Sequence, residues 1–460
     1  MSAARILFVN PDSRRHAGSN VSLLGIIDGL DRARFEPVVA VPPAGEFAAQ
    51  ISARGVETLD YGMNAWWYPT TLQFHQTLAG LRDRVDRLAR LIRESDIRLV
   101  YTNVEYCFDG ALAAALCGVP HVWCMRPPFT DKLDILEHFP LSPAALGLAM
   151  DRLSAMIVCD CVSQRDSFPS SVPPHKLRVI ESGIDIPGAL PSREAARAAP
   201  AARLGIAADS RIVLNVSRMS PEKDLATFLH TARQVVERHP DTVHFVHLGR
   251  SAASPHGQDI LRLADTLGLG GRFHHIGEVE SVYDVMRAAE VFLLTSVDYE
   301  GLVRVCAEAM LTEVPVVSTR CGGPEDYVIE GQTGYLTGVG DAAGLARHVV
   351  HLLDHPAQAR DMGLRARALI AEKYDQPRMN ALWMDLFDEL TAAPARAGFD
   401  VLTLEFTINT LTRLGDIGSA TDRHAKLWRD HAHSAGWLRR QFVQRPLQRL
   451  KRWVAPTRAP

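Results

Sequence analysis

"VFLLTSVDYEGLVRVCAEAM", residues 291–310, joins a short apolar run to a helical pattern through a loop. The run over residues 291–296 is typical of a buried parallel strand. The residues after it predict a loop that holds Glu300 and then the opening of a helix that holds Glu308. A strand, a loop and a helix in this order form the repeating unit of a doubly wound α/β domain.

The same alternation runs along most of the chain. Before residue 190, buried strands are predicted at 5–10, 37–42, 97–103, 121–126, 155–161 and 177–182. Beyond residue 205, further strands are predicted at 211–217, 244–249, 273–277, 291–296 and 315–319. The stretch 186–205, rich in alanine, proline and arginine, is interpreted as an interdomain linker that contains a short helix.

The predicted architecture is therefore two Rossmann-like domains that face each other across a cleft, over residues 1–190 and 206–392. Residues 341–392 look helical throughout, and residues 393–460 form a C-terminal extension. Within the extension, residues 401–408 alternate like a strand, and residues 437–453 carry five arginines and one lysine with no acid. This basic tail predicts either peripheral contact with anionic lipid or packing against the chain's own domains.

Composition limits the classes of function. A chain of 460 residues is longer than a domain with a single hydrophobic core usually is. Its charged residues make up 22% and its formal net charge is −3, which is no polyelectrolyte character, so binding to nucleic acid is not indicated. The seven cysteines lack paired Cys-x2-Cys spacing, which predicts a reduced, cytoplasmic protein without structural zinc. Neither a signal peptide nor a membrane-spanning segment is predicted.

Two cations follow the first strand of the second domain, in "NVSRMSPEKD" (215–224). Arg218 and Lys223 lie in a loop before a helix that Asp224 is expected to cap. Ligands of open α/β sheets bind outside the carboxyl ends of the strands. Both side chains are therefore expected to point into the crevice and to neutralise a leaving diphosphate, the role that Mg²⁺ plays in metal-dependent enzymes.

The loop after residue 296 supplies a second group of ligand contacts. The amides of Gly301, Leu302 and Val303 are expected to face the ligand at the opening of the helix. A loop followed by a helix would bring Glu300 and Glu308 to one ligand more easily than a single helix would.

With these motifs in place, the chain resembles the retaining nucleotide-sugar glycosyltransferases of family 4, which have the GT-B fold. The resemblance covers most of residues 4–390. Besides the two motifs above, it rests on "VIESGID" (179–185), "HHIGEV" (274–279) and "CGGPEDYVIEGQTGYL" (321–336). It implies that Glu300 lies near the donor sugar, that Glu308 binds the nucleotide ribose and that the backbone near Val279 reads the base.

The resemblance also implies that Arg218 and Lys223 contact the donor diphosphate, and it includes departures from the family pattern. The first glycine-rich loop reads "HAGSNVS" (16–22), so Gly18 and Ser19 are expected to let the backbone approach the diphosphate. Cys124 stands where the family usually places a histidine near the donor sugar, with Arg126 two residues later.

The predicted activity is transfer of a hexosyl group from a UDP-, GDP- or similar nucleotide sugar to a glycan, lipid-linked or small-molecule acceptor. The resemblance implies retention of configuration without a metal, with Arg218, Lys223 and Glu300 as the catalytic residues. Two alternatives stay open, a sugar-nucleotide epimerase and a non-catalytic protein that binds a sugar nucleotide or a partner. A dehydrogenase is disfavoured because residues 5–20 lack a Gly-x-Gly-x-x-Gly turn.

One aromatic segment adds a further candidate contact. Trp66, Trp67 and Tyr68 lie in a predicted loop. Their rings are expected to stack on an acceptor sugar, to sit at a lipid interface or to cover the edge of a core.

Overall fold

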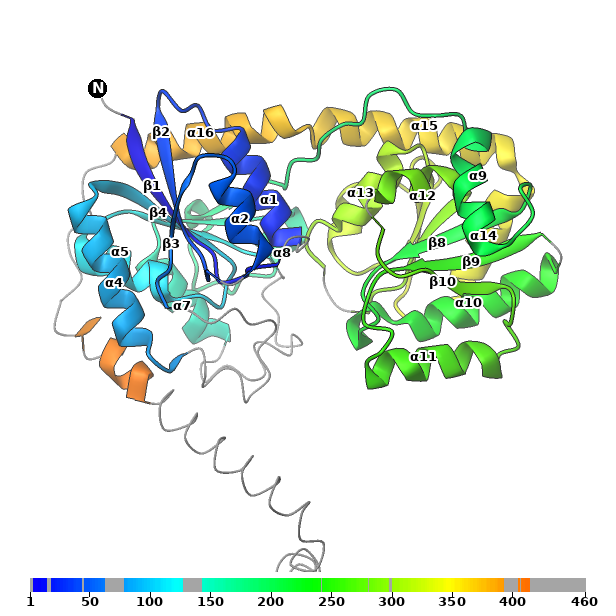
Figure 1. Cartoon of the computed structure of the whole chain (residues 1–460), viewed down its shortest axis with the longest axis horizontal. Helices are drawn as coiled ribbons and strands as arrows, with labels where there is room; N and C mark the ends of the chain where they lie inside the picture. The colour runs from blue at the N-terminus through cyan, green and yellow to red at the C-terminus, as the bar shows by residue number, and fades with distance from the viewer. Residues whose placement is uncertain are drawn as a thin grey trace, which may run out of the picture.

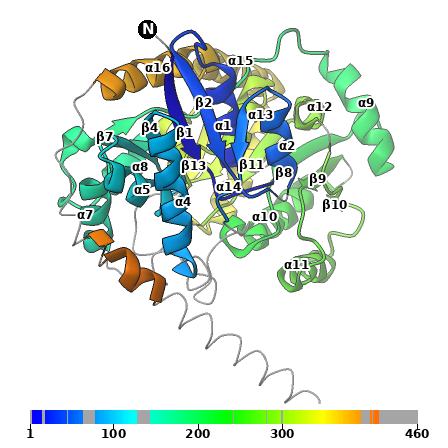
Figure 2. The ribbon, with the colours of Figure 1, turned by 60° about the vertical axis from the view of Figure 1, so that its left-hand side comes forward.

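The computed structural model describes residues 3–14, 18–43, 45–62, 78–126, 143–240, 242–279, 281–297, 300–392, 404–405 and 407–413. Two α/β lobes lie side by side, the first drawn in blue and cyan and the second in green and yellow (Figure 1). Helices α15 (Pro356–Lys373) and α16 (Gln376–Ala392) run along one edge of both lobes, and the view in Figure 2 keeps α16 beside the first sheet.

The first domain, in its described residues, contains a seven-stranded parallel sheet of order β3-β2-β1-β4-β5-β6-β7. The strands are β1 (Ala4–Val9), β2 (Phe35–Ala40), β3 (Glu57–Leu59), β4 (Ile97–Asn103), β5 (His121–Cys124), β6 (Met156–Cys159) and β7 (Leu177–Val179). The helices are α1 (Gly18–Asp28), α2 (Glu46–Ser52), α4 (Leu81–Glu94), α5 (Asp109–Cys117), α7 (Pro143–Leu153), α8 (Val162–Asp166) and the 3-10 turn η1 (Pro174–Lys176).

Both faces of this sheet are buried, which explains why its strands read as continuous apolar runs. Val100 faces the layer formed by α4 and α5, whereas its neighbour Tyr101 faces the layer formed by α1 and α16. Neither side chain is exposed to solvent.

The second domain, as far as the structure describes it, contains a six-stranded parallel sheet of order β10-β9-β8-β11-β12-β13. The strands are β8 (Arg211–Val216), β9 (Val243–Leu248), β10 (Phe273–His275), β11 (Val291–Leu294), β12 (Val316–Thr319) and β13 (Gly334–Thr337). The helices are α9 (Arg193–Leu204), α10 (Leu225–Arg238), α11 (Pro255–Thr266), α12 (Val282–Ala288), α13 (Arg304–Leu311), α14 (Ala342–Asp354), and the 3-10 turns η2 (Pro221–Lys223) and η3 (Gly323–Asp326).

Local capping sets the starts of two of these helices. The side chain of Asp224 accepts a hydrogen bond from the Thr227 amide at 3.1 Å, so the predicted cap of α10 is confirmed. Ser192 caps α9 in the same way at 3.1 Å. Helix α9 ends at Gly205, whose φ of 66° places it in the left-handed region. The short helix expected in the stretch 186–205 is therefore present.

Helix α16 belongs to the first domain by its packing, although the sequence assigned residues 376–392 to the second. Trp383 packs against Tyr101 with ring centroids 5.4 Å apart, and Phe387 packs against Phe8 and Phe35 at 6.1 Å and 5.8 Å. The sequence pattern identifies the helix but does not say which sheet it covers.

The chain crosses between the domains twice, and the two crossings touch. The Ile184 amide donates to the Tyr374 carbonyl at 2.8 Å, and Ile184 forms an isolated parallel bridge with Asp375. We call residues 183–184 and 374–375 the hinge.

The predicted strand at 401–408 is wrong. Residues 404–405 and 407–413 are helical where the structure describes them. Leu404 and Ile408, four residues apart, are buried against the first domain, and Glu405 pairs with Arg82. The apolar residues of this segment fit a helical spacing as well as a strand spacing, and the packing selects the helix.

Several predicted strands also end early. Residues 125–126, 160–161 and 180–182 were expected to continue strands, but they form loops after β5, β6 and β7. Strands β3 and β13 were not predicted.

Two of the sequence predictions fall on residues outside the described part of the chain, and a third concerns membrane-spanning segments. The aromatic loop at 66–68 and the basic segment at 437–453 lie outside the described residues. None of the helices that the structure describes combines the length and the apolar character that a membrane crossing requires.

Candidate active site

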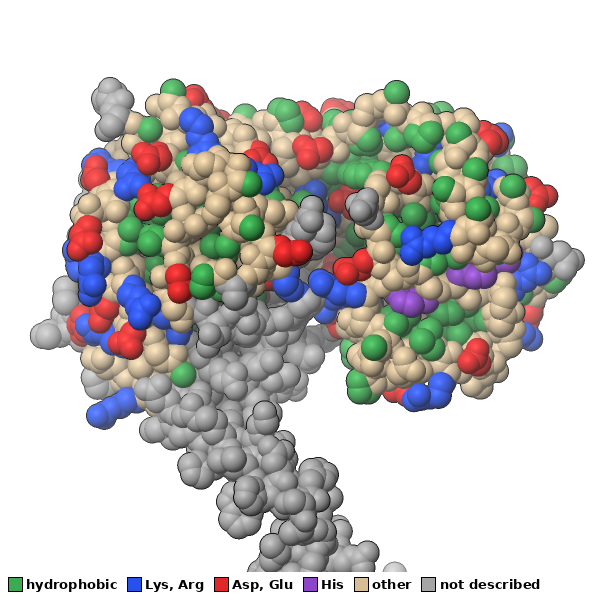
Figure 3. Space-filling view, in the orientation of Figure 1, with side chains coloured by type: hydrophobic (Ala, Val, Ile, Leu, Met, Phe, Trp, Pro, Cys, Tyr) green, Lys and Arg blue, Asp and Glu red, His purple; other side chains and the backbone are tan. Residues whose placement is uncertain are grey.

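The carboxyl ends of the strands in both sheets face a hollow between the lobes, which is visible in Figure 3. We call the carboxyl ends of the strands of one sheet its carboxyl edge. Strand order reverses between β1 and β4 in the first sheet and between β8 and β11 in the second. Ligands of open α/β sheets bind at such reversals. In the second domain, the loops that leave this point hold Arg218, Lys223 and Glu300.

Lys223 and Glu300 form an ion pair across these two loops. Ser296 also donates to the Glu300 carboxylate, at 2.8 Å, and the Thr295 hydroxyl donates to the Lys223 carbonyl at 2.9 Å. Burial raises the pKa of Glu300, but Lys223, Ser296 and Arg218 lower it by more. The net pKa lies below the usual value for glutamate, so Glu300 is a carboxylate at neutral pH.

Arg218 lies in the same loop as Lys223 and donates to Glu222 at 2.7 Å. Ser220 donates to the same carboxylate oxygen at 2.6 Å. The Glu222 carbonyl accepts from the Val297 amide at 3.0 Å, which ties the two loops together. Both predicted cations are therefore present at this edge, and each is paired with a carboxylate. Glu222 was not recognised from the sequence.

The backbone around Glu300 is held closely on both sides. Its amide donates to the Cys321 carbonyl at 2.5 Å, and its carbonyl accepts from Gly323 at 3.0 Å. A Cβ added to Gly323 would lie 1.8 Å from the Gly301 carbonyl oxygen. A Cβ added to Gly301 would lie 2.6 Å from the carbonyl oxygen of Arg126 in the first domain. Glycine is therefore required at both positions for these segments to approach.

The residues that follow open helix α13 as the sequence predicts. Leu302 and Val303 are 7% and 9% exposed, and Val303 occupies the cap position. The Val303 side chain makes no capping hydrogen bond to the first turn of the helix. The apolar cap side chain leaves the N-terminal amides of α13 without a side-chain acceptor from the cap residue. The ligand contacts of the amides of Gly301, Leu302 and Val303 stay predictions.

Glu308 lies on α13, one turn after Arg304, and is largely buried. Burial raises its pKa, and Arg304 opposes this rise. The Nε of Arg304 lies 3.7 Å from the Glu308 carboxylate, and its Nη1 donates to the Gly183 carbonyl at 2.7 Å. Tyr283 is close enough that Glu308 and burial raise its pKa.

Gly18 and Ser19 begin helix α1, and Val279 follows strand β10. Gly18 begins α1 after β1, and a Cβ there would meet nothing within 4 Å. The Ser19 carbonyl accepts from Asn103 at 3.2 Å. Val279 follows β10 and packs against the core of the second domain. The ligand contacts of these three residues stay predictions.

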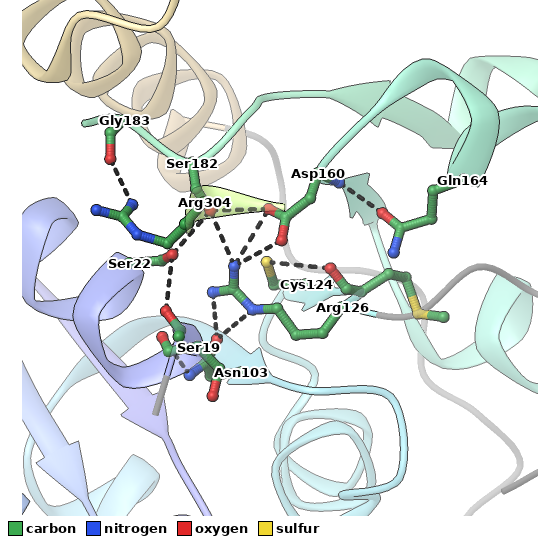
Figure 4. A network of polar contacts seen from close by, with 12 residues as sticks. Ser19, Ser22, Asn103, Cys124, Arg126, Asp160, Gln164, Ser182, Gly183 and Arg304 are labelled. Carbon is green, nitrogen blue, oxygen red and sulfur yellow. Dashed lines mark hydrogen bonds and ion pairs between the residues drawn. The ribbon is translucent and has the colours of Figure 1, made fainter. Parts of the chain in front are cut away.

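The first domain presents a polar network at its own carboxyl edge (Figure 4). Arg126 donates to Asn103 at 2.5 Å and 3.1 Å, to Asp160 at 2.9 Å and 3.1 Å, and to Ser182 at 3.2 Å. Ser22 donates to Ser182 at 2.8 Å. The network joins the ends of β4, β5, β6 and β7 to helix α1. Desolvation lowers the pKa of Arg126, but Asp160 and its other neighbours raise it by more.

Glu105 lies beside this network and is 5% exposed. Among the described residues, its Oε2 atom is buried without a hydrogen-bond partner. Burial raises its pKa to about 7, although Arg126 and two backbone amides oppose the shift. The preceding Val104 has a φ of 117°, which is strained for a branched residue, and its carbonyl accepts from Trp123 at 2.8 Å.

Cys124 is a core residue. Its side chain is fully buried in the apolar layer that also contains Tyr101, and burial raises the pKa of its thiol to about 11. It therefore does not offer the polar contact that a histidine would supply at this position.

Among the described residues, histidine, cysteine, aspartate and glutamate side chains form no group of three or more that is placed to hold a metal ion. The predicted independence of a metal stays a prediction.

Comparison with known proteins identifies relatives of this chain. Residues 210–355 match the family described as "Glycosyl transferases group 1". N-acetyl-alpha-D-glucosaminyl L-malate synthase of Bacillus anthracis is 29% identical over 170 residues, which are 37% of this chain and 43% of that protein. D-inositol 3-phosphate glycosyltransferase of Corynebacterium efficiens is 30% identical over 194 residues, 41% of this chain and 46% of that protein. The chain thus spans about half the length of the curated relatives it matches.

Solved structures extend the likeness to both domains. HepE of Anabaena, in complex with UDP-glucose, has a TM-score of 0.70 at 20% identity, over 84% of this chain and 100% of that chain. The fold is GT-B, as predicted, and the second domain is a glycosyltransferase group 1 domain.

Proposed function

We propose that this chain, with its glycosyltransferase group 1 domain, transfers a hexosyl group from a nucleoside diphosphate sugar to a hydroxyl group of an acceptor. The observation that carries the proposal is the convergence of Lys223, Arg218 and Glu300 at the strand-order reversal of the second sheet. The matched family and the relatives support the same activity. HepE, a GT-B neighbour, is described in complex with UDP-glucose, which supports a UDP-sugar as the first donor to test.

The two cations have a clear task in such a reaction. The glycosidic bond between the sugar and the diphosphate breaks, and the bonding electrons stay on the leaving phosphate oxygen. Lys223 and Arg218 stabilise that charge, because ammonium and guanidinium groups held in a partly buried site act without reorganisation. In the structure, Glu300 and Glu222 hold these side chains in place.

We further propose that transfer retains the anomeric configuration and needs no metal. The acceptor hydroxyl approaches from the face that the phosphate leaves, and the leaving phosphate oxygen takes its proton. The carboxylate of Glu300 is then free to position a hydroxyl of the donor sugar. Glu308 binds the ribose, Val279 lies near the base, and Gly18 and Ser19 face the diphosphate from the first domain.

The acceptor is a glycan, a lipid-linked glycan or a small molecule. Polysaccharide biosynthesis in the cytoplasm fits such acceptors, with peripheral membrane contact through residues 437–453 as a further part of the proposal.

Nucleotide release tests the proposal. UDP-glucose, UDP-N-acetylglucosamine and GDP-mannose are incubated with the protein, with and without acceptors such as inositol 3-phosphate and L-malate, after which two relatives are named. We expect release of nucleotide that depends on an acceptor and persists in EDTA, and a product of retained configuration by NMR.

Other outcomes would redirect the proposal. A changed sugar nucleotide without any acceptor would identify an epimerase. Thermal stabilisation by a sugar nucleotide without turnover would identify a binding protein, the reading that the buried Cys124 favours.

A further inference from the structure

Arg304 stands in an unfavourable place for a cation. It is the first residue of α13, and the first turn of that helix contains no acid. The positive end of the helix dipole repels a cation there. Its side chain is only 16% exposed, so solvent does not explain the position either.

The contacts of Arg304 join two different parts of the molecule. One arm donates to the carbonyl of Gly183, in the hinge, at 2.7 Å. The Nε lies 3.7 Å from the carboxylate of Glu308, which is on the next turn of α13. Figure 4 shows Arg304 reaching from the second domain toward Gly183, close to Ser182 of the first-domain network. The guanidinium fork suits this double contact, whereas the single ammonium of lysine does not.

Burial disfavours the ionised form of Glu308. Burial raises its pKa, and Arg304 opposes the rise. The other titratable neighbour is Tyr283, which in turn faces Asp185. Neither of these two groups carries positive charge, so Arg304 is the cation that acts on this carboxylate among the described residues.

We propose that Arg304 is a positioning residue that holds the Glu308 carboxylate ionised and oriented for the nucleotide ribose, and that the hinge carbonyl of Gly183 holds Arg304 in that position. This inference rests on the proposed function, because it takes Glu308 as the ribose-binding group. Nucleotide affinity then depends on the hydrogen bond between Arg304 of the donor site and the Gly183 carbonyl of the hinge.

The test uses the full-length protein and the nucleotide, among UDP, GDP and ADP, that raises the melting temperature of the wild type most. Affinity is measured by calorimetry at several pH values. We expect Arg304→Gln to weaken binding about tenfold, as the loss of a charge-assisted contact does. Its affinity should begin to fall at a higher pH than in the wild type, as the solution is acidified, because the pKa of Glu308 rises further without Arg304.

A double-mutant cycle separates positioning from a general loss of structure. In a Glu308→Gln background, Arg304→Gln should change affinity by less than about twofold, since the partner is no longer charged. Arg287→Gln is the matched control. Arg287 pairs with Glu313 at 2.7 Å and donates to the linker carbonyl of Pro191 at 3.0 Å, at the opposite end of α13. It should lower the melting temperature and leave nucleotide affinity unchanged.

Arg304→Lys provides a second variant if Arg304→Gln does not fold, and it should bind with intermediate affinity. Wild-type affinity in either variant would overturn the inference, as would an equal effect of Arg304→Gln with and without Glu308. If the wild type binds none of the three nucleotides, the proposed function itself fails, and this inference fails with it.

Discussion

The ion pairs at the carboxyl edges of the two sheets differ in their exposure and in their partners. At the first-domain edge, Arg126 and Asp160 are 14% and 9% exposed and bond to each other and to neighbouring polar groups. At the second-domain edge, Lys223 and Glu300 are 17% and 22% exposed and occupy loops at the point where the strand order reverses. The first edge holds the strand ends together, and we propose that the second receives charge from a ligand.

Lys223→Ala should sharpen this contrast most. We expect turnover to fall about 10³-fold, equivalent to about 4 kcal/mol, because a preorganised charge at the leaving group is lost. The free energy of unfolding should change by less than about 1 kcal/mol, because the ion pair is partly exposed. Single-turnover rates and urea unfolding measure the two effects. A variant that loses stability but keeps its rate would reverse the assignment of the two edges.

Arg126→Met should show the opposite pattern. Removal of the guanidinium leaves Asp160 buried without its cation, so we expect the free energy of unfolding to fall by about 3 kcal/mol. The double variant Arg126→Met, Asp160→Asn should recover part of this loss, since the unpaired charge is gone. Urea unfolding at pH 7 checks both. Equal stability of the wild type and the single variant would mean that the network does not hold the strand ends.

Glu105→Gln should change stability in the opposite direction, by stabilising the folded protein. The folded-state pKa is about 7, above the ordinary value of 4.5, so the native protein binds more protons between these values. The stability that wild-type Glu105 contributes is therefore complete below pH 4.5 and is lost as the pH rises through 7. We expect the variant to be more stable than the wild type by about 3 kcal/mol at pH 8 and by about 1 kcal/mol at pH 5.

Unfolding in urea at the two pH values measures this difference, and Glu94→Gln, on the exposed end of α4, is the control. An equal stability difference at both pH values would show that Glu105 is not the titrating group.

The sequence was informative where the pattern is local. The strand at 97–103 coincides with β4 (Ile97–Asn103), because the run is short and rich in β-branched and aromatic residues, which favours a buried strand over a helix. Lys223 and Glu300 were also identified, since each directly follows a buried strand or lies in the loop after one. The predicted GT-B fold was confirmed, and residues 210–355 match the glycosyltransferase group 1 family.

Features that depend on distant segments were not visible. The network around Arg126 joins residues as far apart in the sequence as Ser22 and Ser182. The sequence pattern places Arg126 and Asp160 inside predicted strands, whereas in the structure they lie in the loops after β5 and β6. The side on which α16 packs is also a tertiary choice, because its apolar face would suit either sheet. The strain at Val104 gives no signal in the sequence, because valine is a favourable strand residue.

The return of α16 to the first domain affects the order in which the protein can be completed during synthesis. Phe8, Phe35 and Tyr101 emerge early from the ribosome, but the rings of Trp383 and Phe387 that cover them emerge late. At ordinary elongation rates, the interval between residues 190 and 392 lasts about 10 to 40 s. During that time the first domain has α1 on this face but lacks the part of the cover that α16 supplies, so we expect the nascent chain to present a temporary site for chaperones there.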